Sequence, residues 1–554
     1  MRAVEEEQLC IFCHAPHWGA AASPGWNRHD TGAFYRIYRS RSTEARIDQP
    51  GYDSRQCLSC HDGRQLLGQV LSRPLTDPIP MTFQTMPPGL SNLTTDLSDD
   101  HPISFRYDRA LSNADRQVYD PQRISRRLPL GEHNTVTCQT CHDPHNNSLN
   151  HFLRLPQKRG ALCLTCHDLF GWHESAHAAS PAVVTGQTFN RRIWPGAGAN
   201  IAGTASGQGV PFNTVADNAC ANCHQVHHAP QEQQLLRFER REENCLVCHD
   251  GSVAGNILRV LGLPYNHKGE ALTDRHSPVE NPRTMPAHVT CVDCHNPHAA
   301  QRGSRNDNLL RPQVILGPVR GTSGVTVHGR LAERVSFEYE VCLKCHGDRP
   351  VPVRDTIPRV LPSMNIRRQI NPSAASSHPF VVYNAGEGVP SLLPEVVNRR
   401  ISCSDCHNAN DAKAFGGTAP NGPHGSIYEF LVALRYETGE FVTESAQNYA
   451  LCYRCHSRSS ILADESFSLH RQHIVTGRSP CSACHDPHGV QTETHLINFD
   501  RSVVSPVPGE GIEYRDRGRF TGSCTLVCHG VNHVNFIYSP ATVAGAAEAA
   551  TRRR

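Results

Sequence analysis

The feature that most constrains this chain is the arrangement of its 24 cysteines. All of them lie in pairs, and the second cysteine of every pair is followed directly by a histidine. Eleven pairs have the spacing C-x-x-C-H, and the last pair has one additional residue between its cysteines. In chain order the motifs are Cys10/Cys13/His14, Cys57/Cys60/His61, Cys138/Cys141/His142, Cys163/Cys166/His167, Cys220/Cys223/His224, Cys245/Cys248/His249, Cys291/Cys294/His295, Cys342/Cys345/His346, Cys403/Cys406/His407, Cys452/Cys455/His456, Cys481/Cys484/His485 and Cys524/Cys528/His529.

Two thiols about one helical turn apart can add to the two vinyl groups of a porphyrin, while the adjacent imidazole binds the iron from the same side. The twelve motifs therefore predict twelve covalent haem c groups, each with the motif histidine as its proximal ligand. A single C-x-x-C could equally be half of a zinc ribbon, an iron–sulfur ligand pair or a redox dithiol. Zinc ribbons do not need the following histidine, and disulfide scaffolds do not pair cysteines so locally. The repetition therefore favours haem.

The composition indicates how such haems would be ligated and enclosed. The chain has 34 histidines and only five methionines, so histidine is the abundant candidate for the second axial ligand. We expect low-spin, bis-histidine haems of low potential. Only 6% of the residues are aromatic, so the porphyrins are expected to supply much of the apolar surface of the core. The predicted fold is that of a multihaem cytochrome c, mostly irregular coil with short helices and few short strands wrapped around a chain of haems, and unfolded without them.

The motifs form a repeat of two. Four of them carry the extended sequence C-H-x-P-H, at 13–17, 141–145, 294–298 and 484–488, and the segment 223–227 reads C-H-Q-V-H. Tandem duplication then divides the chain into six dihaem units, predicted as 1–132, 133–217, 218–287, 288–400, 401–469 and 470–554. In the fifth unit Asn410 stands where the additional histidine is expected, and Gly422-Pro423-His424 follows later. We expect His424 to take over that role.

These additional histidines are the first candidates for distal ligands. A histidine three residues after the proximal one emerges on the same side of the ring, so it is predicted to bind the iron of a neighbouring haem. This group consists of His17, His145, His227, His298, His424 and His488. The second group, chosen from the histidines that follow each second motif, consists of His101, His177, His276, His378, His473 and His533.

Several of these choices stay open. His470 competes with His473, and His173 competes with His177. His133 and His288 lie shortly before first motifs and could replace other members of the second group. Any of these imidazoles could instead pair with a haem propionate.

The paired motifs, the C-H-x-P-H signature and the His-Pro elements between pairs resemble the doubled-CXXCH multihaem c-type cytochromes over nearly the whole chain. The resemblance implies a dodecahaem electron-transfer protein rather than an enzyme. It also implies a place in the periplasm, at the outer membrane or outside the cell. The implied partners are other cytochromes, an outer-membrane conduit, extracellular acceptors or further copies of this chain in a filament.

A catalytic multihaem reductase is the main alternative, in which one iron lacks a distal ligand and binds a small oxyanion or hydroxylamine. The sequence contains no C-x-x-C-K motif of the kind used by pentahaem nitrite reductases. The formal net charge of +2 gives no indication of nucleic-acid binding, and no apolar run reaches the length of a membrane span. Residues 1–7 do not resemble a signal peptide. Since c-type haem is attached outside the cytoplasm, we expect an export signal to have been removed or lost through a wrong start site.

Overall fold

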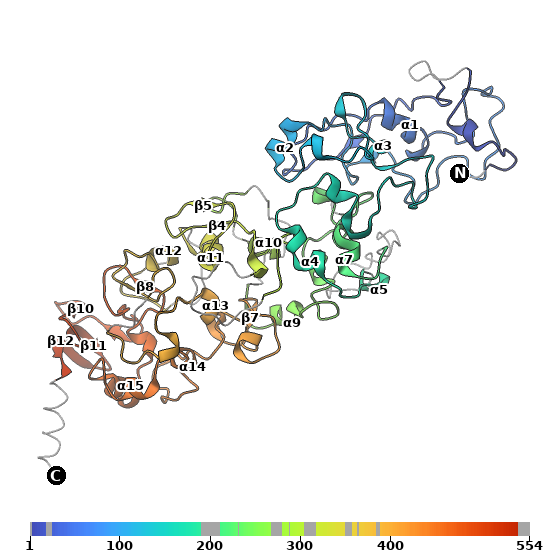
Figure 1. Cartoon of the computed structure of the whole chain (residues 1–554). Coiled ribbons are helices and arrows are strands. Elements are labelled where there is room, and N and C mark those ends of the chain that lie inside the picture. The colour runs from blue at the N-terminus through green and yellow to red at the C-terminus, as the bar shows by residue number, and fades with distance from the viewer. Residues whose placement is uncertain are drawn as a thin grey trace, which may run out of the picture. The chain divides into compact units, whose positions relative to one another are not determined.

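The computed structural model describes residues 3–17, 25–189, 211–230, 232–267, 277, 280–286, 288–303, 317–348, 357–362, 365–383 and 388–540. The chain forms two compact units, each with its own internal contacts (Figure 1). The first unit comprises Met1–Ala254, Ser277–Val279 and Pro297–Ala299. The second comprises Gly255–His276, Glu280–Asn296 and Ala300–Arg554.

Regular structure in the described residues comes in short pieces joined by coil, as the sequence predicts. The helices are α1 Tyr52–His61, α2 Arg109–Asp115, α3 Cys138–Cys141, α4 Ala176–Ala179, α5 Gly186–Phe189, α7 Val215–Asn218, α8 Glu243–Leu246, α9 Ile257–Leu261, α10 Cys291–Cys294, α11 Glu338–His346, α12 Ile366–Gln369, α13 Cys403–Cys406, α14 Ala450–Tyr453 and α15 Arg458–Leu462. Short 3₁₀ turns, among them Leu9–Phe12, Cys163–Thr165, Ala219–Asn222 and Cys481–Ala483, carry further motifs. None of the helices in these ranges has both the length and the apolar composition needed to cross a bilayer.

The strands are equally short, apart from one sheet near the C-terminus. They are β1 Arg36–Ile37, β2 Asp96–Leu97, β3 Tyr265–Asn266, β4 Gly324–Val325, β5 Leu331–Ala332, β6 Ser376–Ser377, β7 Gly425–Ser426, β8 Gly489–Val490, β9 Val504–Ser505, β10 Glu513–Asp516, β11 Gly522–Cys528 and β12 Val531–Tyr538. β1 and β2 pair in parallel, and β3–β7, β4–β5 and β6–β8 pair antiparallel. In the larger sheet β11 pairs antiparallel with β10, β12 and β9 (Figure 1).

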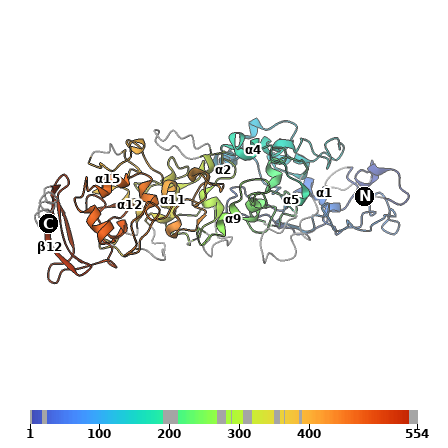
Figure 2. The ribbon, with the colours of Figure 1, turned by 90° about the horizontal axis from the view of Figure 1, so that it is seen from below.

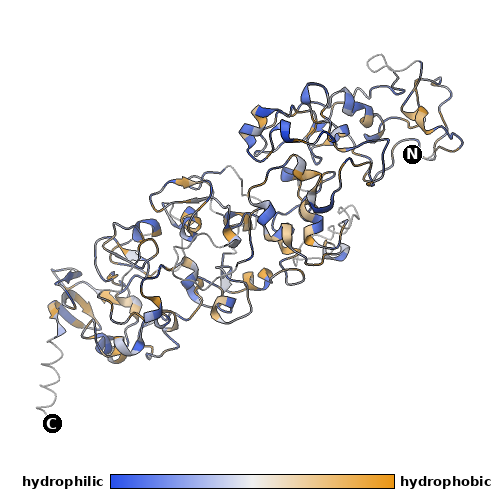
Figure 3. Ribbon diagram, in the orientation of Figure 1, coloured by the Kyte–Doolittle hydropathy of each residue, from blue (hydrophilic) through white to orange (hydrophobic). Residues whose placement is uncertain are grey.

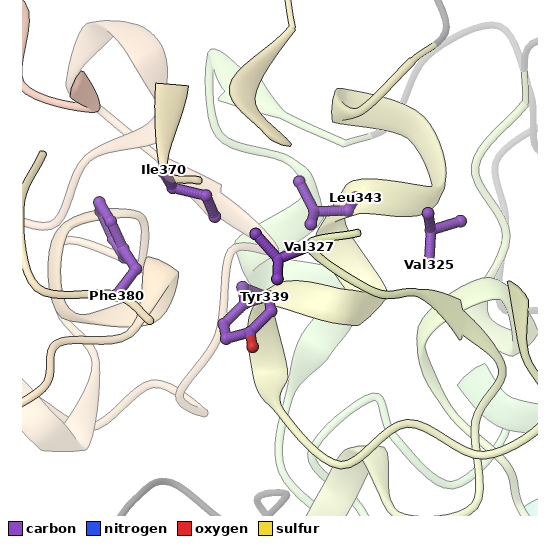
Figure 4. Close-up of a cluster of buried hydrophobic side chains, with 6 residues drawn as sticks. All are labelled: Val325, Val327, Tyr339, Leu343, Ile370 and Phe380. Carbon is purple, nitrogen blue, oxygen red and sulfur yellow. The ribbon is translucent and has the colours of Figure 1, made fainter. Parts of the chain in front are cut away.

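The buried apolar side chains form small clusters. In one of them Tyr339 and Leu343 of α11 pack with Ile370 and Phe380, and Val325 and Val327 complete the group (Figure 4). α12 lies beside α11 in both views of the ribbon (Figure 2). Apolar and polar residues alternate along the ribbon of each unit (Figure 3). Clusters of this size bury too little surface to offset the chain entropy of 554 residues, which is why the fold depends on apolar groups other than side chains.

Local sequence explains why several cysteine pairs lie on a helical turn. At α10 the backbone N–H of Thr290 donates to the Asp293 carboxylate at 2.6 Å, and at α13 the N–H of Ser402 donates to Asp405 at 2.8 Å. At α3 the N–H of Thr137 donates in the same way to the Thr140 hydroxyl at 3.0 Å. Each turn thus has a capping box, with one member before each cysteine. The cap satisfies the end of a four-residue helix that has little intrinsic stability.

Arg28 supports the first unit from its interior. The side chain is 1% exposed, and its guanidinium donates to the Ser59 carbonyl at 3.0 Å and to the carbonyls of Leu67 and Leu66 at 2.9 and 3.1 Å. Arg28→Leu leaves these buried acceptors without donors, and we expect it to lower the free energy of unfolding by about 3 kcal/mol. The measurement is the denaturation midpoint of the haem-loaded protein. Arg46→Leu, which replaces a 91% exposed side chain, serves as the control, and an equal effect of both substitutions would contradict the prediction.

Candidate haem-binding sites

Eleven of the motifs place their cysteines on a helical turn. In nine of them the backbone N–H of the histidine donates to the carbonyl of the first cysteine, at 2.8 to 3.0 Å. The other two motifs end α1 and α11, whose last residues are His61 and His346. Side chains three residues apart on such a turn lie on one side. This geometry fits two thioether bonds to one porphyrin, with the histidine approaching the same ring.

Cys248 and Cys345 illustrate two ways in which the chain holds the second cysteine of a motif. Cys248 lies two residues after the end of α8, and its backbone N–H donates to the carbonyl oxygen of Cys245 at 3.2 Å. Cys345 lies within α11, one residue before the helix ends. Both side chains are half-buried. The haem attachment expected at Cys248 and Cys345 rests on the spacing of their motifs, and it stays a prediction.

Nine of the motif histidines face a second histidine within the described residues. The ring centroids of each pair lie 6.0 to 6.4 Å apart. In the first unit the pairs are His14–His145, His167–His101, His142–His227, His249–His177 and His224–His298. In the second unit they are His346–His267, His295–His424, His456–His378 and His407–His488.

The separation of these rings fits a metal ion between them. A metal–imidazole bond of about 2.0 to 2.1 Å, together with about 1.1 Å from the nitrogen to the ring centre, gives about 6.3 Å between the centres of two axial imidazoles. Imidazoles in direct contact stack more closely, since offset ring pairs pack from about 4.5 Å. The observed 6.0 to 6.4 Å is therefore the spacing of a bis-histidine metal site.

The pairs follow a regular rule along the chain. The additional histidine of each C-H-x-P-H-type segment faces the motif histidine two motifs earlier. His145 faces His14 in this way, and His298 faces His224. The neighbouring site that the sequence left unspecified is thus the first motif of the preceding unit. Second motifs obtain their partner from a histidine 66 to 79 residues before them, as His167 does from His101.

Backbone carbonyls orient the motif histidines. Nδ1 of His142 lies 2.8 Å from the carbonyl oxygen of His151, and Nδ1 of His224 lies 2.8 Å from that of Gln234. The two residues that offer these carbonyls have φ values of 49° and 66°, a left-handed conformation that turns the carbonyl toward the ring. An N–H at Nδ1 leaves the lone pair on Nε2, which is the arrangement that haem and zinc ligands share.

The proline of the C-H-x-P-H segment has a similar task for the partner histidines. Nδ1 of His177 lies 2.9 Å from the carbonyl oxygen of Pro297, and Nδ1 of His267 lies 2.7 Å from that of Pro423. His378 makes the corresponding contact with Pro487. Each of these prolines immediately precedes a histidine that faces another site. One short segment therefore holds the partner histidines of two sites together.

Burial keeps most of these imidazoles in the neutral form that binds metals. Desolvation, with a smaller contribution from nearby imidazoles, lowers the pKa of His167 and His346 to about 4 and that of His298 and His488 to about 3. His227 is the exception, because the Asp100 carboxylate 2.9 Å from its Nδ1 overcomes the effect of burial and raises its pKa.

Some of the expected ligands lie elsewhere. His276 falls outside the described residues, and His267 faces His346 instead. His267 was missed because it precedes no proline, whereas pairing of β3 with β7 brings it beside the segment that ends in His424. His17 is exposed and faces no other histidine ring within the residues described.

The competing histidines are also placed. His473 faces His533, and neither belongs to a cysteine motif. His470 is near His485, since burial and then the His485 imidazole lower its pKa to about 3. His133 is exposed beside Glu132. His288 is buried, with Nε2 3.1 Å from Glu280 and 3.5 Å from Asp293.

Neighbouring motifs also meet through their cysteines. The first cysteines of consecutive motifs are in side-chain hydrogen-bond contact at Cys57–Cys138, Cys163–Cys220, Cys342–Cys403 and Cys452–Cys481. Each contact joins a second motif to the first motif that follows it. Porphyrins bound through these sulfurs would have their edges close together.

Comparison with known proteins gives the same class. Residues 131–170 and 213–254 match the family model for the doubled CXXCH motif. The chain is also 24% identical over 190 residues to the multiheme cytochrome MtrA of Shewanella baltica (strain OS185), a match covering 32% of this chain and 40% of that protein. The chain thus spans less than half the length of this relative. The motifs and both similarities identify a multihaem c-type cytochrome that carries covalent haem c.

Proposed function

We propose that this protein binds twelve haem c groups and conducts electrons between redox partners without catalysing a reaction of its own. The observation that carries the proposal is the set of nine motif histidines that each face a second histidine at 6.0 to 6.4 Å. An iron held between two imidazoles has no open coordination position for a substrate. Such a haem exchanges electrons and does no bond chemistry.

The short segments between sites support close spacing of the haems within each unit. His142 and His145 belong to different pairs but are only three residues apart, so their Cα atoms are separated by at most about 11 Å. The same holds for His224 and His227. Electron tunnelling falls off steeply with distance, so a row of haems linked in this way favours rapid hopping. The protein contributes axial ligands, burial and nearby charge, which set the potentials.

The proposed partners and location follow from the function. A conductor of this kind would receive electrons from one cytochrome and deliver them to another, to an outer-membrane conduit or to an external acceptor. Because c-type haem is attached outside the cytoplasm, we place this exchange in the periplasm, at the outer membrane or outside the cell. The similarity to a multiheme cytochrome supports this placement.

The test is to weigh the purified protein and record its ferric spectrum. Twelve haems add about 7 kDa to the 61.2 kDa chain, at about 0.6 kDa each. We expect that mass, low-spin spectra throughout and no spectral change on addition of nitrite or hydroxylamine. A mass equal to that of the bare chain would refute haem binding. A high-spin haem that binds nitrite would favour a reductase.

A further inference from the structure

The twelfth motif is built differently from the other eleven. Cys524 and Cys528 lie in strand β11 rather than on a helical turn. Residues four apart in a strand are separated by about 13 Å, compared with about 5 to 6 Å for side chains one helical turn apart. Successive side chains in a strand also leave on opposite faces. His529 follows Cys528 directly, with a φ of 50° at the start of the turn into β12, so the structure does not set it beside the thiols.

His529 has other partners in the structure. Its Nε2, the nitrogen that a motif histidine presents to iron, lies 2.5 Å from a carboxylate oxygen of Glu440. Its ring stacks on Phe441, with centroids 4.9 Å apart. These contacts turn the ring toward the segment at 440–441.

A different histidine occupies the position expected of a ligand. His533 of β12 is the cross-strand neighbour of Leu526, which lies between the two cysteines in β11. Residues at alternate positions of a strand, and residues directly opposite each other, share a face of the sheet. His533 therefore lies on the same face as Cys524 and Cys528.

His533 also has the partner expected of a haem ligand. Its ring faces that of His473 with the centroids 6.4 Å apart, within the range of the nine pairs that include a motif histidine. Nδ1 of His473 lies 2.8 Å from the carbonyl oxygen of Leu469, so its Nε2 is the nitrogen left for a metal. Phe467 lies 5.5 Å from the His473 ring, and Phe536 lies 5.4 Å from the His533 ring. Aromatic rings therefore flank the gap.

We propose that His533 and His473 are the two axial ligands of the haem of the twelfth motif, and that His529 is not a ligand. The proximal ligand would then come from the neighbouring strand of the hairpin instead of from the residue after the second cysteine. This inference rests on the proposed function, since it requires haem at this site. It predicts that haem binding ties β12 to the segment at 467–473.

The test uses His473→Ala, His533→Ala, the double variant and His529→Ala, all in the haem-loaded full chain. Mass spectrometry first counts the haems, and electron paramagnetic resonance of the ferric protein then counts the high-spin ones. We expect one high-spin haem in each of the first two single variants. We expect one again in the double variant, because both histidines serve the same iron. His529→Ala should stay low-spin throughout.

Other outcomes would overturn the inference. Two high-spin haems in the double variant would mean that His473 and His533 serve different irons. A His533→Ala protein that stays low-spin, or a His529→Ala protein with a high-spin haem, would return the role of ligand to the motif histidine. Wild-type protein without haem would instead refute the proposed function, so the two failures are distinguishable.

Discussion

Produced in cells that lack a haem-attachment pathway, this chain is expected to be unfolded. Its helices are mostly a single turn, and buried side chains gather in small clusters such as that of Tyr339, Leu343 and Ile370 (Figure 4). Helices of four residues are not stable in isolation. The structure of each unit therefore depends on apolar cofactors between its loops, as metal-dependent domains depend on their metal.

The measurement is small-angle scattering together with circular dichroism. A chain of 554 residues has a radius of gyration of about 90 Å when unfolded, compared with about 24 Å for a compact globule. The haem-free chain should approach the larger value and melt without a cooperative transition. The same chain produced with the attachment pathway is the control. A haem-free protein that is compact and unfolds cooperatively would contradict the expectation.

His227→Ala is expected to convert one haem from low-spin to high-spin. His227 faces the motif histidine His142 at 6.3 Å, and Asp100 orients it from 2.9 Å. Its removal leaves one side of the predicted iron without a protein ligand, so about one-twelfth of the haem should become high-spin and able to bind added imidazole or cyanide. Electron paramagnetic resonance of the ferric protein is the measurement.

The adjacent residue is a closely matched control. His228 lies 3.9 Å from Asp99 and faces no motif histidine among the residues described. His228→Ala should leave all haems low-spin, although it removes the same side chain one position later. Equal spectra for the two variants would argue against the facing pairs as axial ligands. Imidazole added to His227→Ala should restore the low-spin spectrum.

The local part of the fold was predictable from the sequence because it rests on short-range contacts. The C-x-x-C-H spacing indicates a helical turn, and residues such as Thr290 and Asp293 around Cys291 and Cys294 form the cap that stabilises it. The low aromatic content indicated coil with few regular elements, which the structure has. Export and the number of haems stay predictions.

The partners of the motif histidines could be predicted only in part. The residue types and most of the candidates were evident, since His145, His227 and His298 recur at one fixed offset. Which site each reaches depends on the path of the chain between motifs. The choice of His267 over His276 at the site of His346 depends on the pairing of β3 with β7.

The sequence by itself determined the chemistry of this protein, because the attachment of haem requires only two cysteines and a histidine at a fixed local spacing. The tertiary structure alone decided which distant histidine faces each of these sites, and at the last motif it placed His533 rather than His529 opposite a partner. The physical reason is that an axial pair requires two imidazoles about 6.3 Å apart on opposite sides of one iron. Only the folded path of the backbone can bring residues tens of positions apart into that arrangement.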